Sequence, residues 1–265
     1  MKIIPMKVLA NDGVSQSGID TLTSAGFEVI TTKVAQEQLV NYINQNNISV
    51  LLVRSATTAR AALIDACPSL KVIGRGGVGM DNIDVTYARE KGLSVINTPA
   101  ASSSSVAELV FAHLFGGVRY LFDANRNMPL DGDTRFKELK KNYAKGSELR
   151  GKTIGIIGFG RIGREVAKIA LGCGMKVIAS DNYVDTADIT LDFFDGQKVT
   201  LEVKTKPIED LIQQSDFITL HVPAQKQYVI GREQIAKMKN GAAIINAARG
   251  GVIDEVALIE ALESG

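Results

Sequence analysis

The segment TIGIIGFGRIG, residues 153–163, decides the fold of the sequence around it. Its first five residues form an apolar run of strand length, and the residues after Gly163 carry apolar side chains at helical spacing. Three glycines, Gly158, Gly160 and Gly163, stand between the strand and the helix. A buried strand, a glycine-rich turn and an amphipathic helix in this order predict the first unit of a doubly wound parallel sheet.

The spacing of these glycines predicts that a dinucleotide binds at the turn. Gly158 permits the tight turn, Gly160 lets a pyrophosphate approach the backbone, and Gly163 lets the helix pack closely on the strand. Arg161 and Ile162 open the helix, whose free N–H groups and positive dipole end favour a phosphate. Without its flanking strand and helix, the same pattern would indicate only a glycine turn without a ligand.

Asp181 distinguishes between the two nicotinamide cofactors. It stands 18 residues after Gly163, at the carboxyl end of the next predicted strand. A carboxylate there can accept hydrogen bonds from both ribose hydroxyls, and it repels a 2′-phosphate. The next three residues contain no Arg or Lys that would offset this repulsion. We therefore expect NAD rather than NADP, although an aspartate without the upstream glycines would be interpreted as a turn residue.

Strands and helices alternate along most of the chain. Short β-branched runs are separated by amphipathic segments of helical length. Parallel neighbours need such crossovers, so the alternation predicts an α/β protein with two doubly wound parallel-sheet lobes. The predicted strands are Lys7–Ala10, Phe27–Thr31, Ser49–Val53, Lys71–Gly74 and Ser94–Asn97 in the first lobe, and Thr153–Ile157, Lys176–Asp181, Val199–Val203, Phe217–His221 and Ala242–Ala247 in the second.

Composition argues against several classes of protein. The 265 residues include 30 Lys and Arg against 29 Asp and Glu, so no global field attracts nucleic acid or anionic lipid. No apolar run is long enough to span a bilayer. Cys67 and Cys173 lack the spacing of a disulfide framework or a metal site. We expect a cytoplasmic protein without a metal, a nucleic-acid partner or a membrane partner.

A helix and a basic segment follow the first lobe. Ser105 and Glu108 form an S-x-x-E capping box, which predicts that a helix begins at Ser105 and runs to Phe122. From Arg135 to Arg150, six Lys or Arg stand against two Glu. We interpret this run as a solvated or subunit-contacting arm, because no aromatic platform or nucleic-acid-binding module accompanies it.

Three arginines, Arg54, Arg75 and Arg249, stand at the carboxyl ends of predicted strands. Ligands of doubly wound sheets bind at these ends, and a planar, always-charged guanidinium suits a carboxylate or a phosphate. Each arginine alone would be interpreted as part of a surface salt bridge. Together they predict a small anionic substrate in the cleft between the lobes. The glycines around Arg75 and Val78 leave backbone N–H groups accessible to a carboxylate as well.

Several segments, in this order, resemble a known family. They are VRSAT (53–57), GRGGVGMDNID (74–84), NTP (97–99), SVAE (105–108), GFGRIG (158–163), HVP (221–223) and NAARGG (246–251). They resemble the D-isomer-specific 2-hydroxyacid dehydrogenases over essentially the whole chain. Within that family, VRSAT and RGGVGMDNID favour the branch that oxidises 3-phosphoglycerate in serine biosynthesis.

The resemblance implies a fold and an assembly. It implies a flavodoxin-like substrate domain over residues 1–101, incomplete at its C-terminal segment, and a Rossmann NAD-binding domain over residues 102–265 that lacks its last strand or strands. The two domains would close on NAD and the hydroxy acid. The basic arm would contribute to a homodimer.

The resemblance also implies roles for individual residues. Arg249 would be the catalytic arginine that holds the substrate carboxylate and carbonyl. The amides of Val78 and Gly79 would assist it, and the arginines at positions 54 and 75 would face the phosphate. By the same resemblance, Ala247 would help to orient the nicotinamide. The residues themselves predict a role for His221, because Val222 and Pro223 follow it at a strand end near the expected nicotinamide pocket, which favours a wall of the pocket over proton transfer.

The sequence departs from the family in two places. The family's catalytic Glu and His would follow the predicted helix Asp254–Glu263, beyond Gly265. The outer edge of the last predicted strand is also left unpaired. We therefore expect that the sequence is part of a longer protein. We also expect this part to bind the cofactor more effectively than it converts a substrate. The stretch Thr186–Lys206 is strand-rich where a helix would usually cross.

Two other functions stay open. One is a reductase of the glyoxylate, hydroxypyruvate or D-lactate type, which differs in substrate. The other is a non-catalytic NAD-sensing interaction protein, which the missing Glu and His favour. In such a protein the arginines would have no task.

Overall fold

The structure is a computed structural model and describes residues 5–264. The chain divides into two compact units: unit 1 comprises Met1–Ser102, and unit 2 comprises Ser103–Gly265. Both units combine helices with a parallel sheet, as the alternating sequence pattern predicts.

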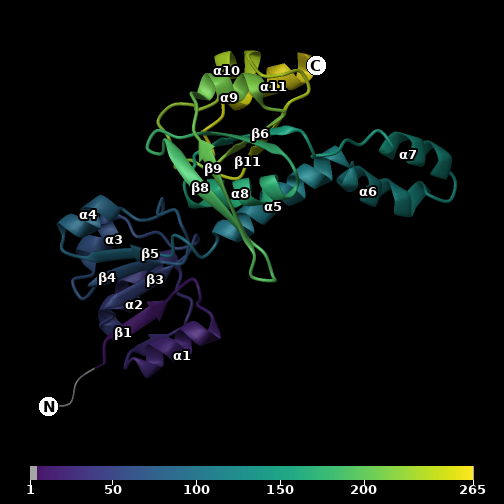
Figure 1. Ribbon diagram of the computed structural model, residues 1–265. Coiled ribbons are helices and arrows are strands. Elements are labelled where there is room, and N and C mark those ends of the chain that lie inside the picture. Colours follow the sequence, from purple (N-terminus) through teal and green to yellow (C-terminus); the bar gives the residue numbers. More distant parts are fainter. Residues whose placement is uncertain (1–4, 265) are drawn as a thin grey trace. The chain divides into compact units, whose positions relative to one another are not determined.

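Unit 1 is built on a five-stranded parallel sheet in the order β2-β1-β3-β4-β5 (Figure 1). This is the flavodoxin-like order, in which the chain reverses direction across the sheet between β1 and β3. All five predicted strands are confirmed to within one residue at each end. The strands are β1 (Lys7–Ala10), β2 (Glu28–Ile30), β3 (Val50–Val53), β4 (Val72–Arg75) and β5 (Ser94–Asn97), and the helices are α1 (Gln16–Ser24), η1 (Gln36–Gln38), α2 (Leu39–Asn46), α3 (Ala61–Ala66) and α4 (Val85–Glu90).

The core of unit 1 lies around the central strands. Leu9, Leu51 and Ile73 are fully buried, and Leu39 and Ile43 of α2 pack into the same cluster. Parallel strands are covered on both faces, which explains why each reads as a short continuous apolar run. The rigid sheet leaves the loops at its carboxyl ends available for binding.

Unit 2 contains a four-stranded parallel sheet in the order β11-β10-β6-β7. This order confirms a Rossmann-like arrangement, with a reversal between β6 and β10. The elements are β6 (Thr153–Ile157), α8 (Arg161–Gly172), β7 (Lys176–Ser180), α9 (Ile208–Gln214), β10 (Phe217–Leu220), α10 (Arg232–Ala236), β11 (Ala243–Asn246) and α11 (Glu255–Ser264).

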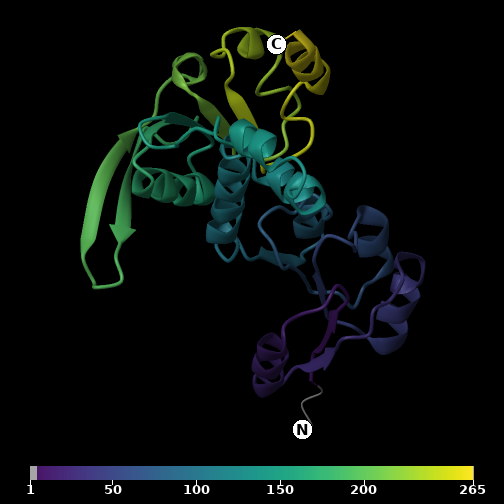
Figure 2. The ribbon, with the colours of Figure 1, turned by 90° about the vertical axis from the view of Figure 1, so that its right-hand side faces the viewer.

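The predicted strand Val199–Val203 forms, but its place in the parallel sheet is wrong. It belongs to β9 (Lys198–Lys204), which pairs antiparallel with β8 (Thr186–Asp192) in a separate two-stranded hairpin. Just after β9, Thr205 forms an isolated parallel bridge with Ala179 of β7. Figure 2 shows the hairpin as a long ribbon that projects from unit 2.

The hairpin forms because its apolar residues alternate with polar ones, as in a sheet with one solvated face. Ala187 lies opposite Val203, and Ile189 lies opposite Leu201. Ala187, Val203 and Ile189 are buried in the core, whereas Leu201 is exposed. A helix has a period of 3.6 residues and could not gather these side chains on one face.

The predicted helix after unit 1 is also corrected. Helix α5 (Ser103–Val118) begins two residues before Ser105, so Ser105 lies inside the helix and is not its N-cap. The helix ends before Tyr120, whose φ of 52° is left-handed, and α6 (Leu121–Asp131) follows. Helices α6 and α7 (Phe136–Tyr143) project from unit 2 as an arm (Figure 1).

Within residues 5–264, no single helix has the length and apolar character of a membrane span. The consecutive helices α5 and α6 reach that length and composition only as a pair, and they are bent by 55° relative to each other.

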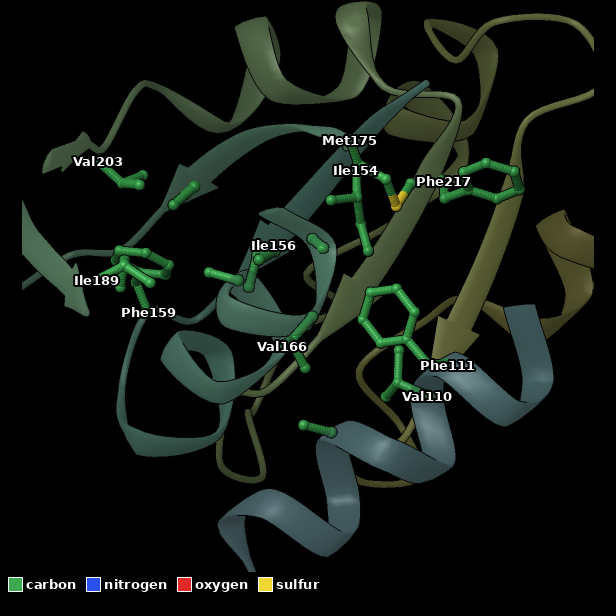
Figure 3. Packing of buried hydrophobic residues seen from close by; sticks show 14 of the residues in the cluster. Val110, Phe111, Ile154, Ile156, Phe159, Val166, Met175, Ile189, Val203 and Phe217 are labelled. Atoms are coloured by element: carbon green, nitrogen blue, oxygen red, sulfur yellow. The ribbon is translucent and has the colours of Figure 1, made fainter. Parts of the chain in front are cut away.

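The core of unit 2 joins α5 to the sheet. Figure 3 shows Val110 and Phe111 of α5 beside Val166 of α8 and Ile156 of β6. These side chains are at most 3% exposed. Helix α8, which follows the glycine turn, is therefore held between the sheet and α5, and this packing fixes the position of its N-terminus.

Candidate functional site

The glycine turn of unit 2 has the geometry that its spacing predicts. Gly158 has a φ of 91°, and a Cβ there would lie 2.6 Å from the carbonyl oxygen of His221. A Cβ on Gly163 would collide with the carbonyl oxygen of Gly158. A Cβ on Gly160 would meet nothing within 4 Å. The first and third glycines are therefore required by packing, whereas the second borders open space that a ligand can enter.

The N-terminus of α8 is free for an anion. Gly160 is the N-cap, and no side chain of the described residues caps the helix there. Arg161, Ile162 and Gly163 occupy the first turn. Their backbone N–H groups have no intrahelical partner, and the helix dipole adds a positive field. Together with the open space at Gly160, this turn fits the pyrophosphate of a dinucleotide.

Asp181 braces the glycine turn, a role that the sequence did not reveal. Its Oδ2 accepts a hydrogen bond from the Phe159 backbone N–H at 2.6 Å, and its Oδ1 accepts one from the Tyr183 N–H at 2.8 Å. Each carboxylate oxygen has a second lone pair available for a ribose hydroxyl. Asp181 can therefore support the turn and receive the ribose at the same time.

A cavity of about 710 Å³ lies at the carboxyl ends of β6, β7 and β10. It brings together six of the ten residues predicted to contact the cofactor, namely Gly158, Gly160, Asp181, His221, Val222 and Pro223. Arg161, Ile162 and Gly163 lie in α8, and neither they nor Ala247 are among the lining residues.

Lys206 also lines this cavity and was missed by the sequence reasoning. It follows the hairpin, and its backbone N–H donates to the carbonyl oxygen of Ala179 at 2.8 Å. Lys206 therefore lines the same cavity as Asp181, although it stands 25 positions downstream in the sequence. Only the hairpin topology brings these two residues near a common space.

His221 is suited to forming a wall rather than accepting a proton. Burial lowers its pKa to about 4, so the imidazole is neutral near pH 7. Its Nε2 lies 3.0 Å from the Thr219 hydroxyl. Its Nδ1 is buried and has no partner among the described residues.

Unit 1 has its own cavity at the carboxyl ends of its strands. Its volume is about 740 Å³, and Arg54 and Arg75 both line it. The Arg75 Nε donates to the carbonyl oxygen of Arg54 at 3.1 Å. The Arg75 Nη1 is buried and has no partner among the described residues. A buried guanidinium donor without a partner is costly, and an anionic ligand would supply the acceptor.

Val78 and Gly79 follow Arg75 by a few residues in the sequence, but they are not among the residues that line this cavity. The Asn97 Nδ2 donates to the carbonyl oxygen of Val78 at 2.7 Å, which fixes the loop after Arg75. The predicted contact of the two amides with a carboxylate stays a prediction.

Arg249 lies in the turn after β11. Its Nη1 donates to the carbonyl oxygen of Ala248 at 2.9 Å. Asn246 shapes this turn, because its Nδ2 donates to the Arg249 carbonyl oxygen at 2.8 Å and its Oδ1 accepts from the Ala248 N–H at 3.0 Å. Arg249 does not line the cavity at the glycine turn. Its predicted catalytic role stays a prediction.

Comparison with known proteins places this geometry in a family. Residues 111–265 match the D-isomer specific 2-hydroxyacid dehydrogenase, NAD binding domain. A hydroxypyruvate reductase of Thermotoga maritima is 41% identical over 262 residues, which are 98% of this chain and 79% of the relative. A D-3-phosphoglycerate dehydrogenase of Methanocaldococcus jannaschii is also 41% identical over 98% of this chain, but the chain spans only 47% of that relative.

A solved structure supports the same assignment. The NAD⁺-bound 3-phosphoglycerate dehydrogenase of Entamoeba histolytica matches 98% of this chain and 78% of its own, with a TM-score of 0.74 and 29% identity. Unit 2 is therefore an NAD-binding Rossmann domain, in agreement with its glycine turn and Asp181. The match over most of the chain's length shows that this protein belongs to the D-isomer specific 2-hydroxyacid dehydrogenase family.

Proposed function

We propose that the protein is an NAD-dependent oxidoreductase that converts 3-phospho-D-glycerate into 3-phosphohydroxypyruvate in serine biosynthesis. The observation that carries this proposal is the pair Arg54 and Arg75 in the cavity of unit 1, where the Arg75 Nη1 has no partner among the described residues. A phosphate dianion has enough acceptor oxygens and charge to bind two guanidinium groups at once. The M. jannaschii relative carries the corresponding name.

The proposed roles follow the geometry of each unit. When bound, NAD accepts the hydride. The N–H groups at the start of α8 hold the pyrophosphate, and Asp181 accepts hydrogen bonds from the ribose. We propose that Arg249 binds the carboxylate and carbonyl of the substrate, with the amides of Val78 and Gly79 as further donors. Ala247 and the wall of residues 221–223 position the nicotinamide.

Oxidation of the alcohol also releases the hydroxyl proton. His221 is not its acceptor, because burial holds its pKa near 4 and its Nε2 faces Thr219. We assign this role to none of residues 5–264. We therefore propose that these 265 residues bind NAD better than they turn over a substrate.

The second candidate is a hydroxypyruvate or glyoxylate reductase. The T. maritima hydroxypyruvate reductase supports it, because the chain covers 79% of that relative. Such an enzyme would act on an unphosphorylated acid, so the cavity arginines would contribute little to the choice of substrate.

The substitutions R54A and R75A distinguish the phosphoglycerate dehydrogenase from the reductase. Each removes one charge-assisted contact, so we expect about a 10- to 100-fold loss of affinity for 3-phosphoglycerate and little change for hydroxypyruvate. Isothermal titration calorimetry measures both affinities in complexes that cannot react, namely 3-phosphoglycerate with saturating NADH and hydroxypyruvate with saturating NAD⁺. Unchanged 3-phosphoglycerate affinity in both variants would contradict the phosphoglycerate assignment.

We also propose a cytoplasmic homodimer. The described residues contain two free cysteines, Cys67 and Cys173, which suits a reducing compartment. The arm formed by α6 and α7 exposes large apolar side chains that a second copy could cover.

A further inference from the structure

One carboxylate holds the loop that carries Arg54. Asp12 follows β1, and its Oδ2 accepts hydrogen bonds from the backbone N–H groups of Arg54 at 2.6 Å and of Thr57 at 3.0 Å. Its Oδ1 accepts the Thr57 hydroxyl at 2.5 Å. Three donors from a four-residue loop therefore converge on a single side chain.

The loop is also anchored in the core of unit 1. Thr57 is 3% exposed, and its hydroxyl, which donates to Asp12, accepts a hydrogen bond from the Asn11 Nδ2 at 2.8 Å. Asn11 in turn exchanges two hydrogen bonds with the Val34 backbone, at 3.0 Å and 2.8 Å. A buried polar network whose members are satisfied in this way resists rearrangement.

The opposite side of the loop is held by Asn82. Its Nδ2 donates to the carbonyl oxygens of Arg54 at 2.8 Å and of Thr57 at 2.6 Å. The Arg54 carbonyl oxygen also accepts the Arg75 Nε at 3.1 Å. The Arg54 residue is thus fixed by Asp12 at its N–H group and orients the Arg75 guanidinium through its carbonyl oxygen.

The position of Asp12 needs an explanation, because its carboxylate lines the cavity that we assign to an anion. Burial raises the pKa of the Asp12 carboxyl, but the hydrogen bonds from Thr57 and the Arg54 backbone together bring it below its ordinary value. The Asp12 carboxylate is therefore ionised, and both of its oxygens accept hydrogen bonds from the loop that carries Arg54.

We propose that Asp12 is a positioning residue that sets the Arg54 backbone and, through it, the Arg75 side chain for binding a phosphate-bearing acid. The inference rests on the proposed function, because it needs an anion at the two arginines. Asp12 does not bind the substrate itself. Its effect passes through the loop, so removing the arginines removes the effect of Asp12.

The test compares D12N with D20N. An amide keeps one acceptor and presents an NH₂ group toward the loop donors, so D12N breaks at least one of the three bonds. Asp20 lies on the exposed helix α1, where its Oδ1 accepts a hydrogen bond from the Gln16 Nε2 at 2.8 Å, and within residues 5–264 no hydrogen bond joins it to the loop. We expect D12N to weaken 3-phosphoglycerate and inorganic phosphate binding about 10-fold in calorimetry, and D20N to leave both affinities unchanged.

A second pair of variants covers the case in which D12N does not fold. T57V removes the hydroxyl that Asp12 accepts, whereas T57S keeps it. We expect T57V to weaken phosphate binding and T57S to retain it. NADH binding, measured by fluorescence, reports on unit 2 and stays unchanged in all of these variants.

A double-substitution cycle separates the two hypotheses. If R54A and R75A leave 3-phosphoglycerate binding unchanged, the proposed function fails. If they weaken binding but D12N behaves like D20N, only the positioning role fails. We expect the effect of D12N to shrink to less than 2-fold in the R54A/R75A background, and an undiminished effect there would show that Asp12 acts independently of the arginines.

Discussion

At the scale of single residues, His221 shows how burial sets a chemical role. It directly follows β10 and lines the dinucleotide cavity, and its carbonyl oxygen leaves no room for a Cβ on Gly158. Burial lowers its pKa to about 4, below the ordinary value of 6.5. The folded protein therefore holds a neutral imidazole at a pH where the unfolded chain already binds a proton.

This difference predicts an acid-sensitive stability. The contribution of His221 is present in full above about pH 6.5 and is lost as the pH falls from there toward 4, because the unfolded state gains the proton first. We expect the free energy of unfolding to fall by about 1 to 3 kcal/mol more in the wild type than in H221Q over this window.

Denaturant unfolding between pH 7.5 and 4.5 measures this difference. The quantity compared is the change in unfolding free energy with pH in the wild type and in H221Q, because the substitution itself can change the absolute stability. NMR titration of the imidazoles reports the same pKa directly, with H113Q identifying the His221 signal. Parallel pH profiles in the wild type and H221Q would contradict the assignment.

At the scale of elements, local sequence patterns predicted most strands but not all of their partners. The strand at 199–203 was found from its β-branched residues, yet it pairs with β8 rather than with β7. Local alternation predicts a strand, whereas the partner depends on which segment reaches it in space. The capping box at Ser105 was wrong as a start signal, because α5 already begins at Ser103, whose side chain is buried.

The residues of the candidate site also differ in whether a local sequence pattern predicts them. The glycine turn and Asp181 lie within one βαβ unit, so their spacing alone predicts where they meet. Asp12, Asn82 and Lys206 act on residues more than 20 positions away, and no local pattern marks them. Sequence reasoning finds sites made of contiguous motifs, and misses the side chains that support them from other elements.

The hairpin provides a prediction at this scale. Only its base is buried, through Ala187, Ile189 and Val203. Thr190 and Thr200 are paired, with their hydroxyls 3.0 Å apart, so a two-residue Asn-Gly turn can replace residues 191–199. We expect the shortened protein to bind NADH within about 2-fold of the wild type, because the hairpin base and Lys206 stay in place.

The matched variant I189A removes a buried side chain from the base instead. We expect it to lower the free energy of unfolding by about 2 to 5 kcal/mol, as is usual for a large-to-small change in a core. Fluorescence titration with NADH and denaturant unfolding give the two readouts. Loss of NADH binding on shortening the hairpin would show that its distal part supports the cofactor cavity.

At the scale of the whole molecule, both units obey one topological rule. In unit 1 the sheet order reverses between β1 and β3, and in unit 2 it reverses between β6 and β10. Each cavity lies at the carboxyl ends of strands beside its own reversal. One unit presents guanidinium groups there and the other an open helix N-terminus, so each has the chemistry for a different anionic ligand.

The arm of unit 2 carries the prediction about assembly. Phe122 and Leu130 of α6 are 77% and 75% exposed, and their spacing of eight residues places them on one helical face. Large apolar side chains gathered on one projecting element mark a surface that a partner covers. We propose that a second copy of this chain covers the exposed face of α6. We therefore expect light scattering after size-exclusion chromatography to show a dimer for the wild type and a monomer for F122D/L130D. The exposed charge variant K141E serves as the control and stays dimeric. A dimer that survives F122D/L130D, with the helical circular dichroism signal intact, would place the subunit contact elsewhere in the chain.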